Sequence, residues 1–180
     1  MTGTMEVVLI RHTSVKVPKG VCYGWSDVPL SDTFEEEAAE VRKNLAPHEP
    51  FDAVFSSPLS RATALAAYCG HPDAITDDRL KELYMGDWEM RAFDDITDPE
   101  LQEWYDDFMH ARTKNGESFP MLYARIASFL DDLRGKPYDK VAIFAHGGVL
   151  MCAGIYAGLF TEEDAIKNHL PYGGIQVMNI

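Results

Sequence analysis

Apolar residues occur along the chain in two patterns, short continuous runs and longer stretches with helical spacing. The short runs predict four strands, at residues 6–10, 53–56, 141–145 and 175–179. The first and third are almost entirely apolar, which is typical of parallel strands that are covered on both faces. The sequence therefore predicts a largely parallel sheet with a buried centre.

Between these strands, apolar side chains recur every three or four residues, which predicts helices. One is expected over residues 34–45, with three glutamates in its first turn, where negative charge is favoured, and with Asp32 or Thr33 as its cap. A second is expected to start with Pro58 in its first turn and to end at Gly70.

Three further helices are indicated within residues 101–108 and 122–133 and after Gly148. Strands that alternate with helices in this way predict an α/β layered fold. We find no internal repeat and no linker-like change of composition, so residues 1–180 are expected to form a single domain.

Charge narrows the range of partners. The chain holds 16 Lys and Arg against 29 Asp and Glu, a formal net charge of −13 at pH 7. Such an acidic protein is not expected to bind nucleic acid or an anionic membrane. A small molecule is the expected partner, and the chain is expected to be a monomer or a homodimer. If the ligand is an anion, the few cationic side chains must be concentrated around it.

The cysteines and the apolar runs bear on the compartment. Cys22, Cys69 and Cys152 are odd in number, widely spaced and without a CxxC pair, which argues against a disulfide framework and a structural zinc site. The N-terminal stretch lacks a basic region, and the longest apolar run, 149–160, is shorter than the roughly 20 residues that span a bilayer. A soluble, cytoplasmic protein is therefore expected.

Two histidines directly follow predicted strands. His12 follows the first, with Arg11 before it, and His146 follows the third, with Gly147 and Gly148 after it. Open α/β sheets bind ligands outside the carboxyl ends of their strands, so both histidines can face one crevice. The two glycines allow a ligand to approach the backbone closely, at a helix N-terminus that favours an anion.

Arg61 lies in the first turn of the helix that follows the second strand, so it is expected at the same edge of the sheet. Each residue taken alone also fits an ordinary structural role, as a histidine at a strand end or an arginine at the surface. Together, Arg11, His12, Arg61 and His146 would form a compact cationic pocket on an acidic protein. Phosphate fits such a pocket, because two guanidinium groups can bind its oxygens bidentately.

Hydrolysis of a phosphoester through a histidine also needs an acid that protonates the leaving alkoxide. A carboxylic acid near a dianionic phosphoryl group is suited to this role, because repulsion between like charges raises its pKa. Residues 80–89 contain three candidates, Glu82, Asp87 and Glu89, and their spacing alone does not distinguish them.

Five motifs in this chain resemble the histidine phosphatase superfamily, also called the phosphoglycerate mutase-like family. Together they cover most of the sequence, in the order expected for the family. They are Leu9-Ile10-Arg11-His12-Thr13, Ser56-Ser57-Pro58-Leu59-Ser60-Arg61-Ala62, Leu80-Lys81-Glu82 with Gly86-Asp87-Trp88-Glu89, Asn115-Gly116-Glu117-Ser118, and Ala145-His146-Gly147-Gly148. The resemblance implies a three-layer sandwich with a mostly parallel central sheet and helices on both faces, and neither metal nor cofactor.

The resemblance also implies roles for individual residues. His12 would attack phosphorus and form a phosphohistidine, Arg11, Arg61 and His146 would hold the phosphoryl oxygens, and Glu82 would donate the proton to the leaving group. The same carboxylate would then activate the water that hydrolyses the phosphohistidine. Glu117, Ser118 and Gly147 match family elements near the substrate and are expected to contact it.

A closer likeness follows the first motif, where Gly20-Val21-Cys22-Tyr23-Gly24 and Asp27-Val28-Pro29-Leu30 are similar to the α-ribazole phosphatases of cobalamin assembly. This likeness implies α-ribazole 5′-phosphate, or the corresponding cobamide phosphate, as the substrate. Cys22, Tyr23 and Gly24 are then expected to line the substrate site. The alternative is that these residues build a loop shared by many members of the family.

The chain departs from the family pattern in two places. The family usually has Gly after the first histidine and then a Glu and an Asn, whereas this chain has Thr13-Ser14-Val15-Lys16-Val17-Pro18. Thr13 and Ser14 are the candidates to replace the missing polar contacts through their hydroxyl groups. The family element Trp-Glu-Gly ends here in Met90, which leaves the local turn unpredicted.

Other functions share some of these residues. The nearest alternative is a sugar-phosphate or broad-specificity phosphatase. Family mutases share the core residues but generally carry extra segments that this compact chain lacks. A non-catalytic phosphate- or phosphoprotein-binding module would need neither His12 nor Glu82. In a metal-dependent hydrolase, Arg11 and Arg61 would repel the cation, and no HxH or HExxH spacing is present.

Overall fold

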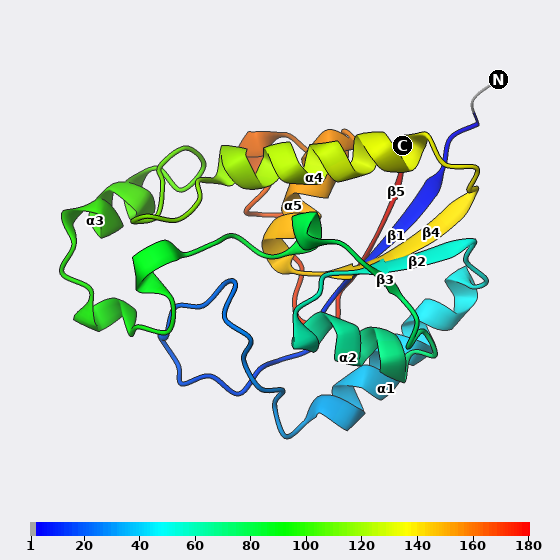
Figure 1. Ribbon diagram of the computed structural model, residues 1–180, viewed down its shortest axis with the longest axis horizontal. Helices are drawn as coiled ribbons and strands as arrows, with labels where there is room; N and C mark the ends of the chain where they lie inside the picture. The colour runs from blue at the N-terminus through cyan, green and yellow to red at the C-terminus, as the bar shows by residue number, and fades with distance from the viewer. Residues whose placement is uncertain (1–2) are drawn as a thin grey trace.

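Five strands form one sheet in the computed structural model, which describes residues 3–180 (Figure 1). The strand order is β3-β2-β4-β1-β5. The strands are β1 (Glu6–Arg11), β2 (Ala53–Ser56), β3 (Ile75–Thr76), β4 (Lys140–Ala145) and β5 (Ile175–Asn179). All neighbours are parallel except β5, which is antiparallel to β1. The four predicted strands are confirmed to within one residue, whereas β3, with only two residues, both exposed, was not predicted.

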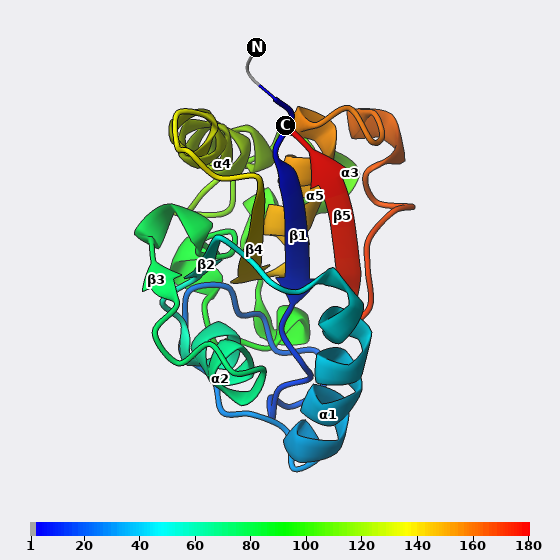
Figure 2. The ribbon, with the colours of Figure 1, turned by 90° about the vertical axis from the view of Figure 1, so that its right-hand side faces the viewer.

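Helices cover both faces of this sheet, so the predicted three-layer α/β sandwich is confirmed (Figures 1 and 2). Helices α1 (Phe34–Leu45) and α2 (Ser60–Tyr68) lie on one face. Helices α4 (Phe119–Arg134) and α5 (Gly147–Tyr156) lie on the other, and α3 (Pro99–Asp106) stands off at the far end of the molecule (Figure 1).

The two cores follow from the alternation of side chains along β1. Val8 and Ile10 point to the α1–α2 side, where they join a cluster with Val41 and Leu65. Val7 and Leu9 point to the other face and belong to the larger cluster, which includes side chains of α4 and α5. A strand that is buried on both faces needs apolar residues at every position, which explains the continuous run in the sequence.

Two predicted helix boundaries were wrong. Helix α2 begins at Ser60 rather than at Pro58, because the sheet pairing extends to Ser57, whose backbone N–H donates to Phe144 O at 2.9 Å, so that Pro58 lies in the turn before the helix. Helix α3 ends at Asp106, before the apolar Phe108. In each case the hydrophobic spacing continued past the point where the backbone changes direction.

The carboxyl ends of β1, β2 and β4 lie at one edge of the sheet, and three long connections cross it. They are residues 12–33, 77–118 and 157–174, which contain only short helical elements. The connection of residues 157–174 ends at this edge because β5 is antiparallel, so that the start of β5 lies beside the end of β1.

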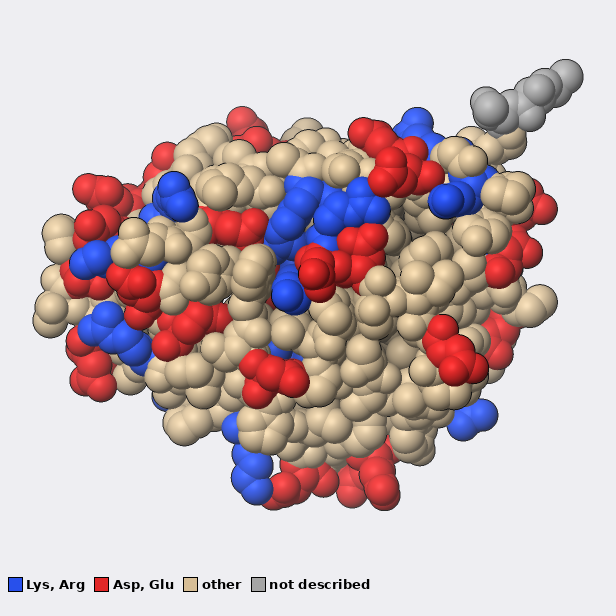
Figure 3. Space-filling model, viewed as in Figure 1, with Lys and Arg blue, Asp and Glu red and all other residues tan. Residues whose placement is uncertain are grey.

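On the face shown in Figure 3, basic side chains form small groups that are interleaved with acidic ones. This distribution agrees with the acidic composition of the chain, with its 29 Asp and Glu. None of the helices between residues 3 and 180 is long and apolar enough to span a membrane.

Candidate active site

The two predicted histidines lie side by side at the carboxyl edge of the sheet. Arg11 at the end of β1 pairs in register with Ala145 at the end of the parallel neighbour β4, so the next residues of both strands are adjacent. The rings of His12 and His146 are 5.2 Å apart between centroids, and both side chains are buried. The structure therefore brings these residues together as the sequence predicted.

The His12 imidazole is held in one tautomer. Its Nδ1 lies 2.7 Å from the carbonyl oxygen of Thr13, and since a carbonyl can only accept, Nδ1 must carry the proton. The pKa of His12 is lowered to about 3, mainly by burial and also by the nearby charges of Arg61 and Arg11, against the hydrogen bond to Thr13. The ring is therefore neutral near pH 7, with a lone pair free on Nε2, as a nucleophile requires.

His146 is also neutral, because complete burial and the neighbouring Arg61 hold its pKa well below the usual range. Its Nε2 lies 2.7 Å from the Ser57 hydroxyl, which also accepts from the Leu59 N–H. A Ser57 hydroxyl that donates to Nε2 leaves the imidazole proton on Nδ1, which has no partner within residues 3–180. His146 can then donate that hydrogen bond to an anionic oxygen.

The two predicted arginines complete a cationic pocket. Arg11 Nη1 donates to Leu170 O at 2.6 Å, and Arg61, which is fully buried, donates to the carbonyls of Gly24 and Ser26. Neither arginine has a carboxylate within salt-bridge distance in the described part of the chain. Burying guanidinium groups without an acidic partner is costly, and a bound anion would offset that cost.

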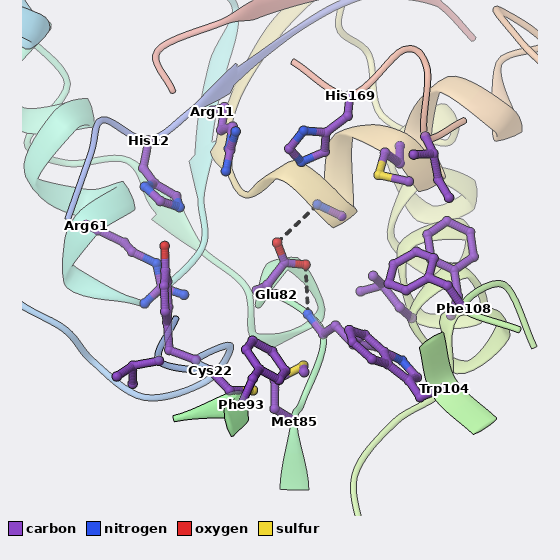
Figure 4. A pocket seen from close by; sticks show the side chains of 18 residues that line it. Arg11, His12, Cys22, Arg61, Glu82, Met85, Phe93, Trp104, Phe108 and His169 are labelled. Atoms are coloured by element: carbon purple, nitrogen blue, oxygen red, sulfur yellow. Dashed lines mark hydrogen bonds between the residues drawn. The ribbon is translucent and has the colours of Figure 1, made fainter. Parts of the chain in front are cut away.

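Glu82 is the one of the three candidate acids that lines the same cavity. Its carboxylate accepts from the backbone N–H of Leu83 at 2.8 Å and of Gly148 at 3.0 Å, the two dashed bonds in Figure 4. Asp87 is exposed and accepts from Asn115, while Glu89 accepts from the backbone of residues 24–26. The geometry therefore agrees with the residue that the family resemblance selects.

The other predicted contact residues divide into two groups. Cys22 and Tyr23 line the cavity, and burial raises the pKa of the Cys22 thiol to about 12, so the thiol is protonated. Gly24 does not line the cavity, and its carbonyl accepts a hydrogen bond from Arg61. Thr13 is completely buried, and its hydroxyl has no partner among the described residues. Gly147 packs so closely against His169 that a Cβ there would lie 2.6 Å from its Nε2.

Three predicted contact residues are turned away from the cavity, and none of them lines it. Ser14 binds Glu37 through its N–H and its hydroxyl, at 3.0 and 2.6 Å. Glu117 accepts from Tyr84 N and forms an ion pair with Arg125, and Ser118 caps α4 by accepting from the backbone of the first turn. Their motifs lie near the site, but the side chains stabilise the loops around it.

The cavity has a volume of about 460 Å³ and two unlike ends (Figure 4). Arg11, His12 and Arg61 lie at one end, and Glu82 lies between this end and an apolar chamber. The chamber is lined by Val21, Leu83, Met85, Phe93, Trp104, Phe108, Phe119, Leu122, Met151 and Ile166. The sequence did not predict this chamber, because its lining residues lie on separate helices and loops, and no local pattern shows how these pack together.

Two polar residues of the site were also missed. His169 lines the cavity, and Tyr172 stacks on Arg11, with the guanidinium carbon 4.2 Å from the ring centroid. The Tyr172 hydroxyl lies 3.1 Å from that of Tyr23, whose ring lies over Arg61. Both missed residues precede β5, and only the antiparallel direction of that strand, which the sequence does not reveal, would have placed them at this edge.

The structure shows the conformation of the turn at Met90, which the sequence did not predict. Met90 adopts φ = 63°, a left-handed conformation that glycine adopts without strain. Its N–H donates to Cys22 O at 2.7 Å, so the backbone follows the path expected of a glycine although the side chain is methionine.

Among residues 3–180, no group of three or more His, Cys, Asp or Glu side chains is placed to hold a metal ion.

Comparisons with known proteins agree with this geometry. The family model of the histidine phosphatase superfamily (branch 1) matches residues 7–180. The adenosylcobalamin/alpha-ribazole phosphatase of Salmonella typhimurium is 32% identical over 155 residues, which cover 81% of this chain and 76% of that protein. Phosphoglycerate mutase-like protein 4 of Arabidopsis thaliana is 31% identical over 157 residues, covering 81% and 67%.

Among solved structures, the alpha-ribazole phosphatase from Shigella flexneri superposes with a TM-score of 0.86 at 26% identity and covers 96% of this chain and 89% of its own. The family model, the phosphatase relatives and the fold together support a phosphatase. The chain belongs to the histidine phosphatase superfamily, branch 1.

Proposed function

We propose that the chain is a metal-independent phosphomonoesterase that acts through a phosphohistidine at His12. The observation that carries this proposal is the state of the His12 imidazole, which is neutral, fixed by Thr13 and flanked by two arginines that have no acidic partner among the described residues. A phosphate monoester at this place would bring its phosphorus to Nε2 and its negative oxygens to Arg11, Arg61 and His146.

The reaction would then proceed in two transfers. In the first, His12 Nε2 forms a bond to phosphorus, the bond to the ester oxygen breaks, and Glu82 gives its proton to that oxygen, so that the product leaves as a neutral alcohol. In the second, the Glu82 carboxylate takes a proton from water as the water oxygen attacks phosphorus. The N–P bond breaks, phosphate leaves, and His12 and Glu82 return to their starting protonation states.

We further propose α-ribazole 5′-phosphate, or the corresponding cobamide phosphate, as the substrate. A relative with 32% identity bears the name of this activity. The apolar chamber beside Glu82 supports the same choice, because it offers aromatic walls such as Phe93, Trp104 and Phe108 to a flat, apolar base. The sugar part of a sugar phosphate would bury several hydroxyl groups in this chamber with few hydrogen-bond partners, which is costly.

The test is a comparison of kcat/KM for α-ribazole 5′-phosphate, common sugar phosphates and nucleotides, each with the unaltered protein and with His12→Ala. We expect α-ribazole 5′-phosphate to be the best substrate and His12→Ala to lack activity on all of them. A preference for sugar phosphates would favour the alternative, a sugar-phosphate or broad-specificity phosphatase. Phosphate binding without any turnover would favour the non-catalytic binding module.

A further inference from the structure

One carboxylate beside the cavity, that of Glu89, takes no part in the proposed transfers yet is fully occupied by hydrogen bonds. Its Oε1 accepts from three successive backbone N–H groups, of Gly24 at 3.0 Å, Trp25 at 2.5 Å and Ser26 at 2.9 Å. Its Oε2 accepts from Gly24 as well, at 2.9 Å. A carboxylate that gathers three N–H groups fixes the conformation of that loop.

The opposite side of the same loop holds Arg61. The carbonyls of Gly24 and Ser26 accept from Nη2 and Nη1 of this arginine, at 2.5 and 2.9 Å. The carbonyl of Gly24 and the N–H of Trp25 belong to one peptide group. That group therefore lies between the two charges, with its oxygen on the guanidinium and its N–H on the carboxylate, and each charge polarises it in the same sense.

Further contacts restrict the movement of the loop formed by residues 24–26. A Cβ on Gly24 would overlap the carbonyl oxygen of Leu83 and lie 3.1 Å from Met85 Cγ, so the loop packs directly against the segment that carries Glu82. The Trp25 indole N–H donates to the carbonyl of Glu82 at 2.6 Å. The loop thus connects the arginine of the cationic pocket to the backbone of the acid.

We propose that Glu89 is a positioning residue for Arg61, acting through the backbone of residues 24–26. Arg61 is fully buried, and its two terminal nitrogens each donate to this loop. The loop therefore sets the direction in which the other N–H groups of the guanidinium point. When Glu89 is removed, the three N–H groups lose their acceptor and the loop relaxes. Arg61 then no longer holds the orientation that a phosphoryl group needs.

The first experiment measures turnover of 4-nitrophenyl phosphate and competitive inhibition by inorganic phosphate. We expect Glu89→Ala to lower kcat/KM by roughly 10- to 100-fold, the scale of a small misplacement of a binding group. It also weakens inhibition by phosphate in the folded fraction, which a loss of stability alone would not change. Asp87→Ala is the matched control, because this exposed carboxylate lies in the same turn and, among residues 3–180, its hydrogen-bond partner is Asn115 alone. We expect it to leave both quantities unchanged.

A double-mutant cycle decides whether Glu89 acts through Arg61. If it does, Glu89→Ala costs about twofold or less when Arg61 is already alanine, because there is no guanidinium left to position. An equal loss in the presence and absence of Arg61 would overturn the proposal. Arg61→Lys replaces Arg61→Ala if turnover of the alanine variant is too slow to measure.

Glu89→Gln keeps the cycle informative if Glu89→Ala does not fold. Its amide oxygen can still accept from the three N–H groups but carries no charge, so we expect a smaller loss with the same dependence on Arg61. The inference rests on the proposed phosphatase activity. An absence of turnover by the unaltered protein would refute that activity, whereas additive losses in an active enzyme would refute only the role of Glu89.

Discussion

Gly148 leaves no room for a side chain beside Glu82, so Gly148→Ala tests the role of that carboxylate without removing it. A Cβ at Gly148 would overlap Glu82 Oε1 and lie 3.2 Å from its Cδ and 3.1 Å from Leu122 Cδ2. The oxygen ends a flexible side chain and can rotate away, so the overlap is relieved by moving Glu82 rather than by unfolding α5. The variant should therefore fold with its acid displaced.

The size of the effect depends on the leaving group. General acid catalysis contributes roughly 10²- to 10⁴-fold, and an alkoxide needs all of it, whereas 4-nitrophenolate leaves without a proton. We expect Gly148→Ala to lower kcat/KM for α-ribazole 5′-phosphate about 100-fold or more, which corresponds to about 2.7 kcal/mol of transition-state stabilisation. The loss on 4-nitrophenyl phosphate should be only a few-fold.

Steady-state kinetics on both esters, with circular dichroism to verify folding, would measure this difference. Gly135→Ala is the matched control, because a Cβ at the end of α4 would meet Asp132 O at an ordinary 3.4 Å. Equal losses on the alkyl and the aryl ester would refute the assignment of Glu82 as the acid, and so would full activity on both.

Three further predictions concern stability. Met90→Gly should raise the free energy of unfolding in urea by about 0.5–1 kcal/mol, because glycine relieves the left-handed φ of 63° at an exposed position; a less stable variant would contradict this. The His12 pKa is about 3 in the folded protein against about 6.5 in the unfolded chain, so its stabilisation is complete above pH 6.5 and is lost as the pH falls towards 3. Between pH 7 and pH 5 the loss should be about 2 kcal/mol, and urea titrations of His12→Asn should lack it. Ser57→Ala removes the hydroxyl that bonds His146 Nε2 and should cost about 1–3 kcal/mol in the same assay, whereas an unchanged midpoint would mean that the bond is dispensable.

The cationic pocket could be predicted from the sequence because it depends on strand ends. Arg11 and His12 end one apolar run and His146 ends another, and parallel neighbours bring such positions together whatever the loops do. Arg61 follows the same logic through the first turn of α2. The family resemblance added the choice of Glu82, which spacing alone left open among three carboxylates.

The rest of the site depends on contacts that no local pattern encodes. The apolar chamber is assembled from residues as distant as Phe93, Phe119 and Ile166, on helices and loops that only tertiary packing brings together. Ser14 and Glu117 were predicted to contact the substrate, yet their side chains bind Glu37 and Arg125 instead. Such partnerships are set by tertiary packing and become visible only in the folded chain.

The covalent intermediate is the central claim, and it can be trapped. The protein would be mixed with 4-nitrophenyl phosphate labelled in its phosphoryl group, because this leaving group needs no proton from Glu82. The reaction would be quenched in alkali within the first turnover, the protein digested, and the labelled peptide identified by mass spectrometry. The account predicts acid-labile label on His12 of the unaltered protein, more of it in Glu82→Gln, and none in His12→Ala. Turnover with no phosphoenzyme, or label on any other residue, would contradict it.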